Sequence, residues 1–76
     1  MRDFIFRLSG NLYRCEWNRL TQKVDIYSLS EYGNPKVFTV NNDEVTPCFK
    51  WKDTTPKMVE VANFLEQCNI YEVLSN

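Results

Sequence analysis

Three cysteines are the residues best suited to chemistry in this chain. Cys15, Cys48 and Cys68 stand 33 and 20 residues apart, and the chain contains no histidine. A cysteine nucleophile needs a histidine, a cation or a helix N-terminus that lowers its pKa. Zinc sites need closely spaced cysteine or histidine ligands, and secreted disulfide frameworks need an even number of cysteines. We therefore expect three reduced, buried thiols, with no metal, no cofactor and no catalytic cysteine.

The sequence also lacks other catalytic motifs. The chain holds two glycines, which is too few for a glycine-rich phosphate cradle. It carries neither a P-loop nor a pair of carboxylates placed for general acid–base catalysis. The sequence therefore predicts that the protein is not an enzyme.

Aromatic rings alternate with cations in residues 13–19 and 49–52. Proteins that bind single-stranded nucleic acid combine stacking rings with a positive groove. The candidate phosphate contacts are Arg14, Arg19, Lys50 and Lys52. However, strand alternation places rings and cations on opposite faces, and a net charge of −1 with a pI of about 5.3 opposes binding to a polyanion. Nucleic-acid binding is therefore the alternative hypothesis.

A second group of aromatic and apolar residues favours a protein interface. In residues 24–29, Tyr27 and Leu29 lie out of phase with the apolar face of the expected strand, and Tyr32 lies at a turn. Ile5 likewise points away from Phe4 and Phe6. If one helix covers only one face of the sheet, we expect several of these side chains to stay exposed on the other face. Tyrosine is enriched at interface hot spots because it buries a large area at low entropic cost. The sequence therefore predicts a protein-binding surface formed by Tyr27, Leu29 and Tyr32.

Alternation of apolar and polar residues predicts the strands that position these groups. The expected strands are residues 3–8, 12–18, 24–29, 36–40 and 48–52. Ser9, Gly10 and Asn11 supply a tight turn between the first two strands, and residues 31–35 carry the strongest turn signal. The polar residues 41–44 interrupt the pattern.

The expected helix begins at Thr55 and Pro56, which match an N-cap followed by proline at the first helical position. Its apolar stripe consists of Met58, Val61, Ala62, Leu65 and Cys68. We expect the helix to end near Cys68 with Asn69 in the left-handed conformation, and residues 70–74 to form a short closing strand. The prediction is one α+β domain over residues 1–76, with a meander of four to five antiparallel strands and one C-terminal helix on one face.

Charge is distributed unevenly along the chain. Residues 1–23 carry five basic and two acidic groups, whereas residues 58–76 carry Glu60, Glu66 and Glu72 and no base. An acidic helix face is therefore a further candidate surface, for a basic partner. The chain shows no signal peptide and no apolar run long enough to cross a membrane, so we expect a cytoplasmic protein.

These observations favour a small, soluble, non-enzymatic module that binds another protein. Six residue types with A/T-rich codons (Asn, Lys, Phe, Tyr, Ile and Met) make up 27 of the 76 residues. This composition suggests a gene from an A/T-rich genome, such as that of a phage, a mobile element or a low-GC bacterium. Small size and the lack of catalytic groups then favour a phage or mobile-element inhibitor or adaptor that acts on a host protein. An uncovered edge strand could also pair two copies of the chain.

Overall fold

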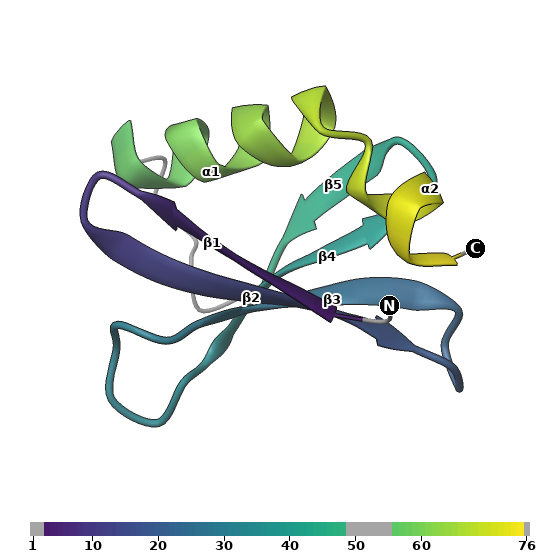
Figure 1. Cartoon of the computed structure of the whole chain (residues 1–76), viewed down its shortest axis with the longest axis horizontal. Helices are drawn as coiled ribbons and strands as arrows, with labels where there is room; N and C mark the ends of the chain where they lie inside the picture. The colour runs from purple at the N-terminus through teal and green to yellow at the C-terminus, as the bar shows by residue number, and fades with distance from the viewer. Residues whose placement is uncertain (1–2, 49–55, 76) are drawn as a thin grey trace.

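Five strands follow one another in an antiparallel meander, and two helices complete the chain (Figure 1). The computed structural model describes residues 3–48 and 56–75. In chain order the elements are β1 (Asp3–Leu8), β2 (Asn11–Asn18), β3 (Lys23–Ser28), β4 (Lys36–Asn41), β5 (Glu44–Pro47), α1 (Pro56–Gln67) and α2 (Ile70–Ser75). The predicted α+β class and antiparallel sheet are confirmed. No helix within the described residues is long and apolar enough to cross a membrane.

The first hairpin turn follows directly from its residues. Leu8 pairs with Asn11, so Ser9 and Gly10 form a two-residue connection. Their φ angles are 49° and 81°. Two consecutive positive φ values are typical of a type I′ turn, whose twist matches that of the flanking strands. The predicted turn is therefore confirmed.

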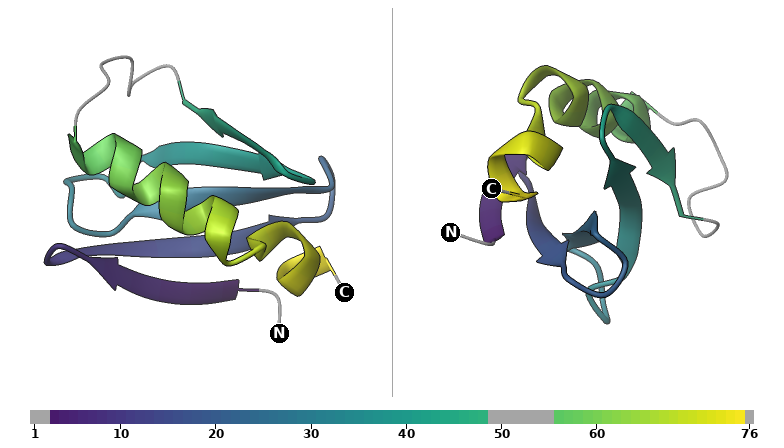
Figure 2. Two further views of the ribbon diagram at one scale, coloured as in Figure 1. Left: turned by 90° about the horizontal axis from the view of Figure 1, so that it is seen from above. Right: turned by 90° about the vertical axis from the view of Figure 1, so that its right-hand side faces the viewer.

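The sheet curls, and both helices pack on its concave face (Figure 2). The core between them consists of Phe6, Tyr13, Cys15, Val24, Ile26, Val37, Phe38, Val40, Val61, Leu65, Ile70 and Leu74. The ring of Phe6 stacks on Tyr13 with centroids 5.2 Å apart and on Phe64 with centroids 4.3 Å apart. These stacked rings join β1, β2 and α1, because each element contributes one ring.

The C-terminal segment corrects one prediction. Asn69, two residues after the end of α1, takes φ 52° as expected, but residues 70–74 belong to helix α2 and not to a strand. Ile70 and Leu74 are both buried, and their spacing of four residues places them on one helical face toward the core. The hydroxyl of Tyr71 donates a hydrogen bond to the carbonyl of Gln22 at 3.2 Å, which fixes α2 to the β2–β3 connection.

The fifth strand lies earlier than predicted. Residues 41–44, expected to interrupt the pattern, form the tight turn of a hairpin in which Asn41 pairs with Glu44 and Val40 with Val45. Cys48 follows β5 and donates its backbone N–H to the carbonyl of Val37 at 2.8 Å. The remainder of the strand predicted over residues 48–52, and the predicted N-cap Thr55, lie outside the described residues.

We predict that Leu65→Ala lowers the free energy of unfolding by about 2–5 kcal/mol, because Leu65 is 1 % exposed and truncation leaves a cavity under α1. The neighbouring Glu66→Ala is the control, since Glu66 is exposed and surface changes usually fall within about 0.5 kcal/mol. Urea denaturation followed by circular dichroism measures both. Equal midpoints for the two variants would contradict the packing of α1 described here.

Candidate functional site

The predicted interface residue Tyr27 lies on the convex face of the sheet, opposite the helices. Strand register aligns it with Arg14 on β2 and, through Arg14, with Ile5 on β1. On its other side Tyr27 is paired with Lys36 of β4, just after a register irregularity. Ile5 is 56 % exposed, whereas Tyr27 is half-buried. Tyr27 is therefore the centre of a row that runs across four strands.

A second row of the convex face brings Leu29 beside Leu12. Leu12 pairs with Arg7 of β1, and the backbone N–H of Leu29 donates to the carbonyl of Leu12 at 2.8 Å. Both leucines are half-buried. Leu12 is diagonal to Ile5 in this register, a distance over which large side chains still interact across a sheet. We call Ile5, Leu12, Tyr27 and Leu29 the convex patch.

Tyr32 is fully exposed, with a relative accessibility of 105 %, and lies at the tip of the β3–β4 loop. The neck of this loop is closed by a hydrogen bond from the N–H of Ser28 to the carbonyl of Pro35 at 2.9 Å. At its tip the N–H of Asn34 donates to the carbonyl of Glu31 at 3.1 Å, and Gly33 takes φ 83°. A positive φ at the third position is the requirement of a type II turn, which glycine meets without strain. The loop therefore presents Tyr32 on a defined turn.

Two further contacts connect this loop to the rest of the molecule. The hydroxyl of Ser30 accepts a hydrogen bond from the N–H of Leu12 at 2.9 Å. The Nζ atom of Lys57 on α1 lies 3.8 Å from a carboxylate oxygen of Glu31. Because Leu12 belongs to the convex patch, the first contact holds the loop that carries Tyr32 next to that patch.

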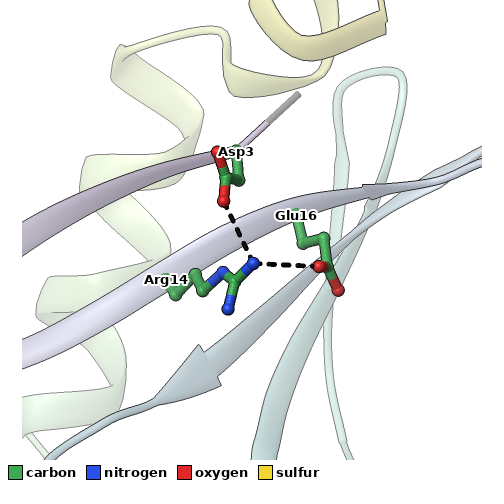
Figure 3. Close-up of polar contacts among 3 residues, drawn as sticks. All are labelled: Asp3, Arg14 and Glu16. Atoms are coloured by element: carbon green, nitrogen blue, oxygen red, sulfur yellow. Dashed lines mark hydrogen bonds and ion pairs between the residues drawn. The ribbon is translucent and has the colours of Figure 1, made fainter. Parts of the chain in front are cut away.

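The cation at the centre of the convex face is already neutralised. One terminal nitrogen of Arg14 lies 3.0 Å from Asp3 and 3.1 Å from Glu16 (Figure 3). All three side chains are partly exposed, so each ion pair contributes roughly 0–1 kcal/mol. The main effect of the two ion pairs is to hold the guanidinium of Arg14 between the carboxylates of Asp3 and Glu16 and to offset its positive charge.

A buried carboxylate organises the neighbouring row. Asp25 is 4 % exposed, accepts a hydrogen bond from the Nδ2 atom of Asn18 at 3.0 Å and lies 3.8 Å from the Nζ atom of Lys36. The Oδ1 atom of Asn18 accepts hydrogen bonds from the backbone N–H groups of Leu20 and Thr21 in the β2–β3 turn. Burial, and then the charge of Asp25, raise the pKa of Tyr27, so this phenol stays neutral.

Of the four predicted nucleic-acid contacts, the described residues include Arg14 and Arg19, which lie in different parts of the structure. Arg14 lies within β2 and is paired as described above, whereas Arg19 is exposed in the β2–β3 turn. That turn lies at the end of the sheet opposite the loop carrying Tyr32. Lys50 and Lys52 lie outside the described residues. Sequence reasoning missed Leu12, although its phase relative to the inward-facing Tyr13 already placed it on the outer face.

The cysteines are free, and burial raises the pKa of each thiol. The effect is largest for Cys15, whose pKa rises to about 12, with a smaller contribution from Cys68. A protonated thiol is a poor nucleophile and a poor metal ligand. Among residues 3–48 and 56–75, no three histidine, cysteine or carboxylate side chains are grouped to hold a metal ion.

Two buried hydroxyls on the concave face form no hydrogen bond with residues 3–48 or 56–75. Tyr13 of β2 pairs with Ser28 of β3, and both side chains are fully buried. Neither the Oη atom of Tyr13 nor the Oγ atom of Ser28 forms a hydrogen bond within the described part of the chain. A buried, unpaired polar group costs about 1–3 kcal/mol. These hydroxyls therefore reduce the stability of the core.

We predict that stability falls between pH 8 and pH 10 because of Cys15. The unfolded thiol ionises near its ordinary pKa of 9.0, while the folded thiol stays protonated up to about 12. The stabilising contribution of the protonated Cys15 thiol is therefore present below its unfolded pKa and is lost progressively as the pH rises from about 9 towards about 12. Wild type should lose about 1–1.5 kcal/mol more than Cys15→Ala from about pH 8 to pH 10. Identical pH dependence in urea titrations would show that Cys15 is not buried as described.

We predict that Tyr13→Phe raises the free energy of unfolding by about 1 kcal/mol, because it removes an unpaired buried hydroxyl. Tyr71→Phe is the matched control. It removes a hydroxyl that does form a hydrogen bond, to Gln22, and should lower stability by about 0.5–1.5 kcal/mol. Thermal and urea unfolding of both variants test this. A loss of stability in Tyr13→Phe would mean that its hydroxyl has a partner in solution.

Comparisons of the chain with protein-family models, with curated proteins and with solved structures found no match. The functional conclusion therefore depends on the geometry of the described residues.

Proposed function

We propose that this protein is a non-enzymatic module that binds another protein through the convex patch and Tyr32. One observation carries the proposal: both helices lie on the concave face (Figure 2), and the strand register places apolar residues at neighbouring positions on the other face. Isolated apolar residues on a surface are common and need no explanation. Here four lie in two adjacent rows, with Arg14 between Ile5 and Tyr27, and a fully exposed tyrosine lies on the structured turn that follows β3.

The composition of this surface fits a protein partner. Tyrosine is among the residues enriched at interface hot spots, and half-buried side chains such as Tyr27 lose little conformational freedom on binding. Ile5 and Tyr32 provide accessible apolar area, being 56 % and 105 % exposed. Leu12 and Leu29 extend this area between them. We expect the partner to present a complementary apolar surface.

The charges of the convex face favour a protein over a nucleic acid. The outward-facing strand positions carry four cations and four carboxylates, namely Arg7, Arg14, Lys23, Lys36, Asp3, Glu16, Asp25 and Glu44. Arg14 and Lys36 lie beside carboxylates of the chain itself. Nucleic-acid affinity comes largely from unneutralised cations that displace counterions from phosphates. Among the described strand positions of this face, cations and carboxylates are therefore equal in number.

In biological terms, we propose that the protein is encoded by a phage or mobile element and acts in the cytoplasm as an inhibitor or adaptor that binds a host protein. The A/T-rich codon composition supports this origin. A small surface centred on two tyrosines is sufficient for such a role, since few residues carry most of the energy of an interface.

We predict that affinity capture from the native host enriches one protein with wild type, and that Tyr27→Ala and Tyr32→Ala each weaken its binding about 5- to 150-fold. Leu20→Ala is the matched control. Leu20 is also an apolar turn residue, 96 % exposed, but lies at the opposite end of the sheet. Quantitative mass spectrometry identifies the protein, and titration with the purified partner gives the affinities. Circular dichroism confirms that each variant is folded.

Two results would contradict this proposal. Unchanged capture by the two tyrosine variants would exclude the convex patch and Tyr32. Recovery that nuclease abolishes, with a log–log salt slope of about −3, would instead support the nucleic-acid hypothesis through four phosphate contacts. In contrast, an apolar protein interface should lose little affinity when salt increases tenfold.

A further inference from the structure

Strand β1 is an edge of the sheet without the usual protection against pairing. It lies outermost in the strand order, while both helices lie over the concave face (Figure 2). Natural edge strands are commonly very short, or carry proline, lysine or a bulge. The other edge strand, β5, has four residues and ends in Pro47. In contrast, β1 has six residues without proline or lysine, and its register with β2 is regular from Asp3 to Leu8. Of the two edges, β1 is therefore the one suited to pair with a further strand.

The backbone groups that β1 directs outward belong to Asp3, Ile5 and Arg7. On β2, the carbonyl of Leu12 accepts a hydrogen bond from Leu29, and its N–H donates to the β3–β4 loop, so both groups point away from β1. Leu12 is paired with Arg7, and the two residues of such a non-hydrogen-bonded pair both direct their backbone groups outward. Because this pattern alternates along an antiparallel ladder, Ile5 and Asp3 direct their groups to the same side as Arg7.

We propose that two copies of this chain pair through β1, antiparallel and about a twofold axis at Ile5. In this register Ile5 lies opposite the partner's Ile5, and Asp3 lies opposite the partner's Arg7. Each opposed pair can exchange two backbone hydrogen bonds, because these are the residues whose groups point outward. A slip of one residue would turn the faces of the two sheets to opposite sides.

The side chains of the convex face favour this register. Arg7 is exposed and forms no ion pair within residues 3–48 and 56–75. Asp3 is partly exposed and uses one of its two carboxylate oxygens for Arg14. Opposite charges that face each other across strands are stabilising, and the twofold axis forms this pair twice. The neighbouring registers with the same faces would instead place Asp3 or Arg7 opposite Ile5.

Apolar side chains complete the interface on both faces. On the concave face Phe4, which is half-buried, would lie opposite the partner's Phe6, and aromatic pairs across strands are stabilising. On the convex face the pairing would cover Ile5, which is 56 % exposed, and would join the convex rows of the two copies. The pairing depends on backbone groups and on Asp3 and Arg7, so it does not depend on the proposed function.

The first test measures the mass of the purified full chain by sedimentation velocity over a series of concentrations. We expect a reversible dimer with a Kd of roughly 1–100 μM, since the shared edge is small. Asp3→Lys places two cations opposite each other, and Arg7→Glu places two carboxylates opposite each other. Each variant alone should therefore dimerise roughly tenfold more weakly or worse. An equimolar mixture of the two variants restores both opposite-charge pairs and should form a heterodimer with the affinity of wild type.

The second test removes one backbone donor. Ile5→Pro deletes the outward N–H of residue 5, while Phe4 and Phe6 keep their hydrogen bonds to β2, and proline is tolerated on edge strands for this reason. This variant should be monomeric. Ile5→Val is the matched control, since it keeps the N–H and an apolar side chain and should dimerise as wild type does. Circular dichroism confirms that each variant is folded.

Three outcomes would overturn the inference. The first is a folded wild type that remains monomeric at about 1 mM. The second is a dimer that persists in Ile5→Pro, and the third is a mixture of the two charge variants that stays monomeric. Tyr32→Ala should leave dimerisation unchanged, so failure of the proposal that the convex patch and Tyr32 bind another protein would not affect this result.

Discussion

Helix α1 packs across the concave face of a curled meander whose two outer strands do not pair with each other (Figure 2). The stacked rings of Phe6 and Phe64 connect it to β1, and Val61 and Leu65 complete the core. The other features of the molecule depend on this arrangement. Because one face is covered by the helices, apolar side chains on the other face remain available to a partner. Because the chain turns at Asn69 between α1 and α2, residues on both sides of this junction line a depression beside the β4–β5 turn.

Local sequence patterns predicted most of the sheet and α1, because they depend on residues close in the chain. The alternation in β1 and β2 and the apolar stripe of α1 are such patterns. The strand β5 was missed because it has only four residues and only one of them, Val45, is an apolar residue packed against the core. One apolar residue gives no alternating pattern. Helix α2 was mistaken for a strand because Ile70, Tyr71 and Val73 favour β structure. Burial of Ile70 and Leu74 against the sheet overrides that preference.

The candidate sites were less predictable, because they depend on register. The outward phase of Tyr27 and Leu29 follows from alternation, and the exposure of Tyr32 follows from its turn. However, the position of Leu12 beside Leu29, and the ion pairs of Arg14, require knowledge of which residues face each other across strands. A depression beside the β4–β5 turn is lined by residues between 40 and 45 and between 65 and 70, and no local pattern of the sequence predicts that these two segments lie together.

The order of the elements along the chain has a consequence for biosynthesis. All four strand pairs join neighbours in sequence, so each hairpin can form within about 1–10 μs of its synthesis. The helices that cover the concave face are encoded after the last strand, and a ribosome needs about 1–4 s to add residues 56–75 at roughly 5–20 residues per second. During that interval Phe6, Ile26 and Phe38 have no helix above them. The nascent sheet therefore exposes its apolar face for about a million times longer than a hairpin takes to fold, and this interval is when the chain is most prone to aggregate or to need a chaperone.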